Sequence, residues 1–373
     1  MTAETMRAWA EIDLQALVQN LQYARELSGK KIMCVIKGDA HGHGAVACGR
    51  ALEKAGADAF GVACLEEGIA LRKSGSRLPI LVLGWTPAEF AGELIRYDLT
   101  QSVLDEDYAR QLSEAVTAPL QVHVKLDTGM SRTGILAQED PAEAAQAILR
   151  ISQLPKLHLT GIFTHFAAAD MPEKDDFTAW QKQNYEAVLS KLESLGFDRP
   201  ITRHVGNSAT IMYHPEAHFD MVRMGVMMYG LYPDGVYQPD GPLKPILALK
   251  ARVAQVKELP AGAVISYGCT AKTTRRTKIA VVSAGYADAY PRSLSNTGAY
   301  AVIRGQKCPQ IGRVCMDLCM FDITDAAEEI CRGDEVILYG KGGMPMEEVA
   351  RFGNTINCQP LSVLTNRVKK VYI

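Results

Sequence analysis

A lysine at the end of a hydrophobic segment is the first residue of this sequence that indicates chemistry. In KIMCVIKGDAHGHG, residues 31–44, an apolar run ends at Lys37 and passes directly into a turn rich in glycine and histidine. An amine is seldom placed at the inner end of a buried strand unless it is used there, because burying its charge is costly. Desolvation lowers the pKa of a lysine and makes it nucleophilic near neutral pH, which favours Schiff-base chemistry at Lys37.

Further polar residues stand at the ends of later apolar runs. They are Lys125 and Asp127 in QVHVKLD, His165 in GIFTH and the segment 204–208, whereas Arg223 lies within the eighth run, VRMGVMMYG. Small residues with backbone N–H groups follow in HVGNSAT and RMGVMMYG, where a phosphate could bind. If these runs are strands of one barrel, the polar side chains gather at one rim.

The elements that must position these residues alternate between apolar and amphipathic segments. Eight short, β-branched runs are separated by stretches of helical periodicity; they cover residues 31–37, 59–64, 80–84, 99–104, 121–127, 159–165, 202–207 and 222–230. Strands that alternate with helices predict parallel βαβ units, and eight of them predict a closed (β/α)₈ barrel. A doubly wound open sheet is the alternative, but no GxGxxG follows the first strand.

Composition changes after YGLYPDGVYQPDGPLKP, where proline and glycine cluster. Beyond it, LALKARVAQVKEL, TKIAVVSAGYAD, AYAVIRGQ and DEVILYG predict a mostly antiparallel β domain. We therefore predict two domains, a (β/α)₈ barrel over residues 1–240 and a C-terminal β domain over residues 241–373. The first ten or so residues could pack with the β domain.

Charge and cysteine usage exclude several classes of function. The chain carries 40 basic and 42 acidic residues in no long blocks, which argues against a nucleic-acid or anionic-membrane partner. No apolar run approaches the roughly 20 residues that cross a bilayer, and the N-terminal segment lacks the apolar core of a signal peptide. The nine cysteines are odd in number, and CMDLC has no partner pair at zinc spacing. We expect reduced thiols, no metal and a cytoplasmic location.

The motif around Lys37 resembles a known cofactor signature. VIKGDAHGHG is similar to the pyridoxal-phosphate signature of alanine racemases, A-V-[IV]-K-A-[ND]-A-Y-G-H-G. The resemblance continues in family order through KLDTGMSRTG, THFAAAD, NSA, VRMGVMMYGLYP, SYGCT, GYADAYPR and GRVCMD, and covers essentially the whole chain. It implies a racemase that interconverts L- and D-alanine with pyridoxal 5′-phosphate, supplies D-amino acid for peptidoglycan, and works as a homodimer with shared active sites.

The resemblance also implies roles for single residues. Lys37 would hold the cofactor covalently and act as one acid/base, and Tyr267, from the partner subunit, would be the second base on the opposite face. Arg223 would face the pyridine nitrogen, and His165 would link it to Tyr267. The other residues implied for cofactor binding are His41, Asn207, Ser208, Gly225, Val226 and Cys358. Those implied for the substrate, besides Tyr267, are Arg132, Met316, Asp317 and Tyr286. Lys125 is a carbamylation candidate that would orient Arg132.

Two positions depart from the family pattern. The tyrosine of the signature is here His41, and the tyrosine of a C-terminal I-N-Y-E segment is here Cys358, in TINCQPLSVLTNRV. An imidazole can still donate a hydrogen bond, whereas a thiol is small and a weak donor. The pocket should therefore be roomier around the substrate's β-carbon. This predicts, as an alternative function, a serine or broad-specificity racemase of small amino acids.

Two rival functions remain. Pyridoxal-phosphate decarboxylases of similar architecture place a glutamate at the pyridine nitrogen and carry a glycine-rich phosphate loop. Arg223 and the lack of a GGG-type loop count against that function. Non-catalytic pyridoxal-phosphate-binding relatives consist of a single barrel, whereas this sequence has SYGCT and a full β domain.

Overall fold

The computed structural model describes residues 5–373, which form two compact units. The barrel unit comprises Leu21–Asp39 and Ala45–Met228. The β unit comprises Ala40–Gly44, Tyr229–Ile373 and the N-terminal part of the chain to Asn20. The chain thus leaves the barrel unit shortly after Lys37 and returns to it at Ala45.

Eight parallel strands form the barrel, in the order β10, β2, β3, β4, β5, β6, β8, β9. Their bounds are Met221–Met224 (β10), Lys31–Val35 (β2), Ala59–Val62 (β3), Ile80–Val82 (β4), Thr100–Val103 (β5), Leu120–Asp127 (β6), Leu157–Phe163 (β8) and Thr202–His204 (β9). Two backbone hydrogen bonds, Asp220 N to Arg203 O (3.1 Å) and Arg223 N to Gly206 O (2.9 Å), link the first and last segments. The sheet nearly closes, which confirms the predicted (β/α)₈ fold.

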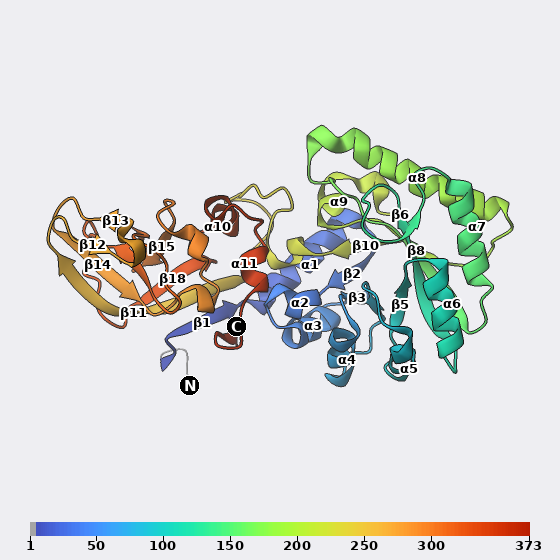
Figure 1. Ribbon diagram of the computed structural model, residues 1–373, viewed down its shortest axis with the longest axis horizontal. Helices are drawn as coiled ribbons and strands as arrows, with labels where there is room; N and C mark the ends of the chain where they lie inside the picture. Colours follow the sequence, from blue (N-terminus) through green and yellow to red (C-terminus); the bar gives the residue numbers. More distant parts are fainter. Residues whose placement is uncertain (1–4) are drawn as a thin grey trace. The chain divides into compact units, whose positions relative to one another are not determined.

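Helices lie around the outside of these strands (Figure 1). Their bounds are Ala45–Lys54 (α3), Leu65–Lys73 (α4), Ala91–Arg96 (α5), Glu106–Ala115 (α6), Pro141–Ser152 (α7) and Asp175–Ser194 (α8). Asp105 and Asp140 begin α6 and α7 by accepting first-turn N–H groups, which a helix cannot satisfy internally. Met33, Ala59, Leu81 and Met221 pack together inside the barrel, as buried parallel strands require.

The β unit is mostly antiparallel, as predicted. Strand β11 (Leu247–Leu259) is its longest and pairs with three others. The remaining strands are Ala8–Ile12 (β1), Val264–Ile265 (β12), Ala271–Lys272 (β13), Thr277–Val282 (β14), Tyr300–Ile303 (β15), Gln306–Pro309 (β16), Cys319–Asp322 (β17), Glu335–Gly340 (β18) and Lys369–Tyr372 (β19). Strand β1 joins this sheet between β11 and β19, so the N-terminal strand belongs to the β unit. Two short helices, Met346–Gly353 (α10) and Gln359–Ser362 (α11), were not predicted.

One close approach inside the barrel gives a direct test of the packing. Gly161 in β8 pairs with His123 in β6, and a Cβ at residue 161 would meet the His123 ring at 2.6 Å. We expect Gly161→Ala to destabilise the protein by about 1–3 kcal/mol through overpacking. Gly92→Ala is the matched control, because Gly92 lies in α5 with open space around it, and alanine should stabilise that helix by roughly 0.5–1 kcal/mol. Urea unfolding gives the free energy of unfolding of both variants. Equal changes in this free energy would contradict the close contact between Gly161 and His123.

Candidate active site

Lys37 lies exposed just beyond the C-terminal end of β2, at the rim of the barrel. Two backbone amides beside it, those of Gly38 and Ala63, donate to the two carboxylate oxygens of Glu67 at 2.6 and 2.7 Å. One side chain in α4 therefore ties the turn after Lys37 to the end of β3. This fixes the backbone from which the amine projects.

The turn that follows Lys37 is left-handed. The φ angles run from +51° to +87° in Gly38–Gly42, including the non-glycine residues Asp39, Ala40 and His41. Such residues each cost roughly 1–2 kcal/mol in this conformation, so other contacts must hold them. Asp39 accepts from the Ala45 amide at 2.7 Å, and within the β unit His43 Nδ1 donates to Ala40 O at 2.8 Å. Strain of this size at a functional turn is typical of a site held ready for a ligand.

Arg223, in β10, is the buried cation of the rim. Its Nη1 bonds to His204 Nδ1 and to His204 O, both at 2.9 Å. Its Nη2 bonds to Thr164 O at 2.7 Å and to His165 Nδ1 and Val205 O at 3.0 Å. None of these bonds uses Nε, so this N–H stays available for a ligand acceptor. Burial lowers the pKa of Arg223 to about 10, and the group is still charged at neutral pH.

The histidines around Arg223 are neutral, and the hydrogen bonds that Arg223 donates determine their tautomers. Burial, and next the charge of Arg223, holds the pKa of His165 and of His204 well below the usual value. Arginine can only donate, so both Nδ1 atoms accept and both protons sit on Nε2. His204 Nε2 then donates to His123 Nδ1 at 2.9 Å, and burial lowers the pKa of His123 to about 4. His165 is left with an Nε2–H that can donate to an anionic oxygen.

Lys125 and Asp127, at the end of β6, make different contacts. Both are buried, and Lys125 Nζ donates to the carbonyls of Leu126 (3.0 Å) and Thr133 (3.3 Å). Asp127 accepts from the backbone amides of Gly129, Ser131 and Arg132, each at 3.0 Å. Among residues 5–373, no ion pair joins Lys125 or Arg132 to Asp127. Asp127 therefore shapes the loop that carries Arg132, whose side chain is exposed.

A cradle that suits an anion lies at the ends of β9 and β10. Asn207 caps the short helix α9 (Ser208–Tyr213) by accepting from Thr210 N at 3.0 Å. Ser208 Oγ accepts from Gly225 N (3.0 Å) and Met227 N (3.3 Å), which leaves its own hydrogen free to donate. A Cβ at Gly225 would occupy open space bounded only by Ser208 Oγ at 3.5 Å. The predicted residues 207, 208, 225 and 226 thus lie together and suit an anion.

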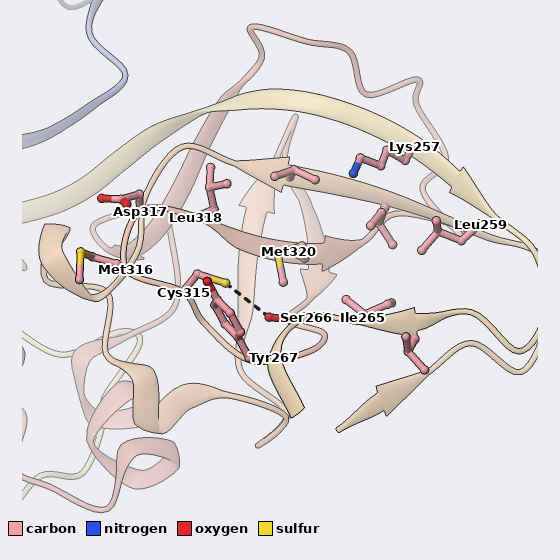
Figure 2. Close-up of a pocket in the computed structure, with 13 residues that line it drawn as sticks. Lys257, Leu259, Ile265, Ser266, Tyr267, Cys315, Met316, Asp317, Leu318 and Met320 are labelled. Carbon is pink, nitrogen blue, oxygen red and sulfur yellow. Dashed lines mark hydrogen bonds between the residues drawn. The ribbon is translucent and has the colours of Figure 1, made fainter. Parts of the chain in front are cut away.

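The other predicted residues lie in the β unit. Tyr267 stands at the tip of the hairpin β12–β13 and is 67% exposed. Met316 and Asp317 line the same pocket of about 510 Å³, and Figure 2 shows Tyr267 beside Cys315. Asp317 accepts from Arg367 Nη2 at 2.6 Å, and the exposed Tyr286 donates its amide to Cys315 O at 3.0 Å.

The two departures from the family signature also belong to the β unit. His41 Nδ1 lies 3.2 Å from the hydroxyl of Tyr229. Tyr229 also stacks on His43, with ring centroids 4.3 Å apart. Cys358 is half-buried and precedes α11, where its carbonyl accepts from the Ser362 amide at 3.2 Å. All nine cysteines are free thiols.

The comparisons with known proteins agree with this arrangement. The family models described as "Alanine racemase, N-terminal domain" and "Alanine racemase, C-terminal domain" match residues 12–233 and 246–372. An alanine racemase of Clostridium novyi is 40% identical over 98% of this chain and 95% of the relative. The solved alanine racemase of Clostridium difficile 630 has a TM-score of 0.90 at 39% identity, over 99% of this chain and 96% of that chain. This chain belongs to the alanine racemase family.

Alanine racemases are pyridoxal-phosphate-dependent isomerases. A second structure of the Clostridium difficile enzyme is a complex with cycloserine (TM-score 0.88, 38% identity, 99% of this chain and 96% of that chain). These relatives are named for alanine, so the serine alternative drawn from Cys358 is not favoured. Within residues 5–373, no cluster of three metal-ligating side chains and no helix long and apolar enough for a bilayer is found.

We predict that the buried amine of Lys125 reacts with carbon dioxide. Burial, followed by the charge of Arg223, lowers the pKa of its amine to about 7, so the neutral form grows as the pH rises from about 6 to 8. A neutral amine adds carbon dioxide to give a carbamate and releases a proton. We expect ¹³C-bicarbonate to give a carbamate resonance that strengthens over this pH range and is missing in Lys125→Arg. An equal resonance in the variant would contradict the prediction.

Proposed function

We propose that this protein racemises alanine with pyridoxal 5′-phosphate by a two-base mechanism, in which Lys37 and Tyr267 act on opposite faces of the substrate. The observation that carries the proposal is the state of Arg223. It is a buried cation on the same rim as Lys37, held by carbonyls and neutral histidines, with its Nε–H left for an acceptor. A pyridine nitrogen is such an acceptor.

Residues of the barrel rim fit three parts of the cofactor. Lys37 would hold it covalently, Arg223 would donate to its ring nitrogen, and Ser208 with the Gly225–Val226 turn would hold its phosphate. Bound pyridoxal phosphate acidifies the Cα proton of an attached amino acid. Because a guanidinium does not give up its proton, Arg223 would keep the ring nitrogen unprotonated. An unprotonated ring would withdraw electrons less strongly, which would disfavour transamination and decarboxylation.

The chain's own residues would then move one proton on each face. The Lys37 amine would take or return the proton on one side of Cα, and the Tyr267 phenolic oxygen would do so on the other. The Nε2–H of His165 would donate to that oxygen when it is anionic, linking Tyr267 to Arg223. Arg132 and the Met316 amide would bind the substrate carboxylate, with Asp317 and Tyr286 beside them.

A homodimer with shared sites is part of this proposal. Lys37 belongs to the barrel unit and Tyr267 to the β unit. The Tyr267 side chain is exposed beside two other exposed apolar residues, Met316 and Leu318, and within residues 5–373 nothing bonds to its hydroxyl. A phenol presented in this way suits a pocket of a second copy of the chain. His41 and Cys358 would border that pocket near the phosphate.

The direct test is a chiral assay of L-alanine with and without added pyridoxal phosphate, on wild type and Tyr267→Phe. We expect wild type to form D-alanine with the cofactor only. Removing the phenolic base should lower kcat by about 10²- to 10⁴-fold, because one of two proton transfers loses its catalyst. The cofactor's bound absorbance should persist, since Lys37 is intact.

Tyr213→Phe is the control, because this partly exposed tyrosine lies outside the proposed machinery. Formation of an amine and carbon dioxide from alanine would instead support the decarboxylase. Unchanged racemisation by Tyr267→Phe would refute the two-base assignment.

A further inference from the structure

The residue before Tyr267 has a backbone conformation that serine rarely adopts. Ser266 has φ +67° and ψ −174°, a region that is essentially restricted to glycine. Gly268 (φ +70°) and Cys269 (φ +50°) extend the positive φ angles through the tip of the hairpin β12–β13. A non-glycine residue stays in such a conformation only when neighbouring contacts impose it.

Those contacts come from the segment Gly312–Cys315. Ser266 Oγ donates to Arg313 O at 2.6 Å, and the Cys315 thiol lies 3.4 Å from Ser266 Oγ (Figure 2) and donates to Arg313 O at 3.6 Å. Gly312 approaches from the other side, since a Cβ there would lie 2.8 Å from Ile265 Cγ2 and 3.1 Å from Ser266 Cβ. The tip of the hairpin is thus fastened at Ser266.

The direction of the Tyr267 side chain depends on this fastening. Its ring is largely exposed, and within the described part of the chain no residue bonds to its hydroxyl. Within one chain, the backbone of the tip therefore sets the direction of the phenol before a second copy of the chain contacts it. If Ser266 relaxed to an ordinary extended conformation, the Cα–Cβ bond of Tyr267 would point elsewhere.

We propose that Ser266 is a positioning residue for Tyr267: its hydroxyl bond to Arg313 O holds a strained backbone that presents the phenol to the substrate. The inference rests on the proposed function, in which Tyr267 is one of two bases. A loose tip would slow the proton transfer on the Tyr267 face and leave the Lys37 face unaffected. Misplacement of a catalytic group by about 1 Å can cost 10²-fold in rate.

Two substitutions separate the hydrogen bond from the strain. Ser266→Ala removes the hydroxyl and keeps a side chain that the conformation disfavours. Ser266→Gly removes the hydroxyl and suits the conformation. We expect both to lower kcat about tenfold to a hundredfold with a smaller change in KM. In the cofactor-free protein, Ser266→Gly should have a higher urea midpoint than Ser266→Ala, because glycine relieves the strain.

Hydrogen exchange at Cα in D₂O tells which base is affected. In both variants, one enantiomer of alanine should still exchange its α-hydrogen through Lys37 while inversion is slow, so the ratio of exchange to racemisation rises about as much as kcat falls. Ser194→Ala, which also removes a serine-to-carbonyl bond (2.7 Å to Lys191 O) but lies at the end of α8, should leave the ratio unchanged.

The outcomes separate the two proposals. A wild-type protein that does not racemise alanine overturns the proposed function and this inference with it. Wild-type racemisation, with normal kcat and normal exchange ratio in both Ser266 variants, overturns the inference alone. Equal losses of exchange and racemisation, or a lower urea midpoint for Ser266→Gly than for Ser266→Ala, would also overturn it.

Discussion

Inversion at a carbon centre requires that a proton leave one face and return to the other. No single side chain can reach both faces without turning the substrate over, so two groups must be fixed on opposite sides of one plane. In this chain the candidate groups belong to different compact units, an amine after β2 and a phenol on a hairpin of the β unit. Each unit therefore contributes half of the proposed chemistry.

The two halves are held in different ways. On the barrel side, a buried cation is surrounded by acceptors that carry no charge. Burial, and next the charge of Arg223, lowers the pKa values of the two histidines and keeps them neutral. Phe163 stacks on His204 with ring centroids 4.8 Å apart, and the guanidinium carbon of Arg223 lies 5.5 Å from the centroid of the Phe163 ring. In the β unit, the side chain of Tyr267 is not held by burial. Its backbone is instead held by the contacts that keep Ser266 in a strained conformation. Within one chain, the direction of this exposed side chain is set by its backbone.

Much of this could be predicted from the sequence, because the informative signals are local. Eight apolar runs in the sequence predicted all eight barrel strands. Polar residues in or at the end of four of these runs, namely Lys37, Lys125, His165 and Arg223, were therefore expected on one rim. Features that depend on distant contacts could not be predicted. Glu67 is an ordinary helix glutamate in sequence, and the packing of Gly161 on His123 depends on the register between β6 and β8. Ser266 and the left-handed turn at Asp39–His41 break local rules, so propensity would have placed glycine there.

The central claim is that an amine and a phenol from separate copies of the chain form one site. It is tested by co-expressing Lys37→Ala and Tyr267→Phe chains with different affinity tags and isolating the hybrid dimer. In that hybrid, one of the two symmetric sites combines the intact lysine of one chain with the intact tyrosine of the other. We expect the hybrid to show about half of the wild-type racemase activity per dimer, although the two parents are each nearly inactive. A hybrid as inactive as its parents would contradict it.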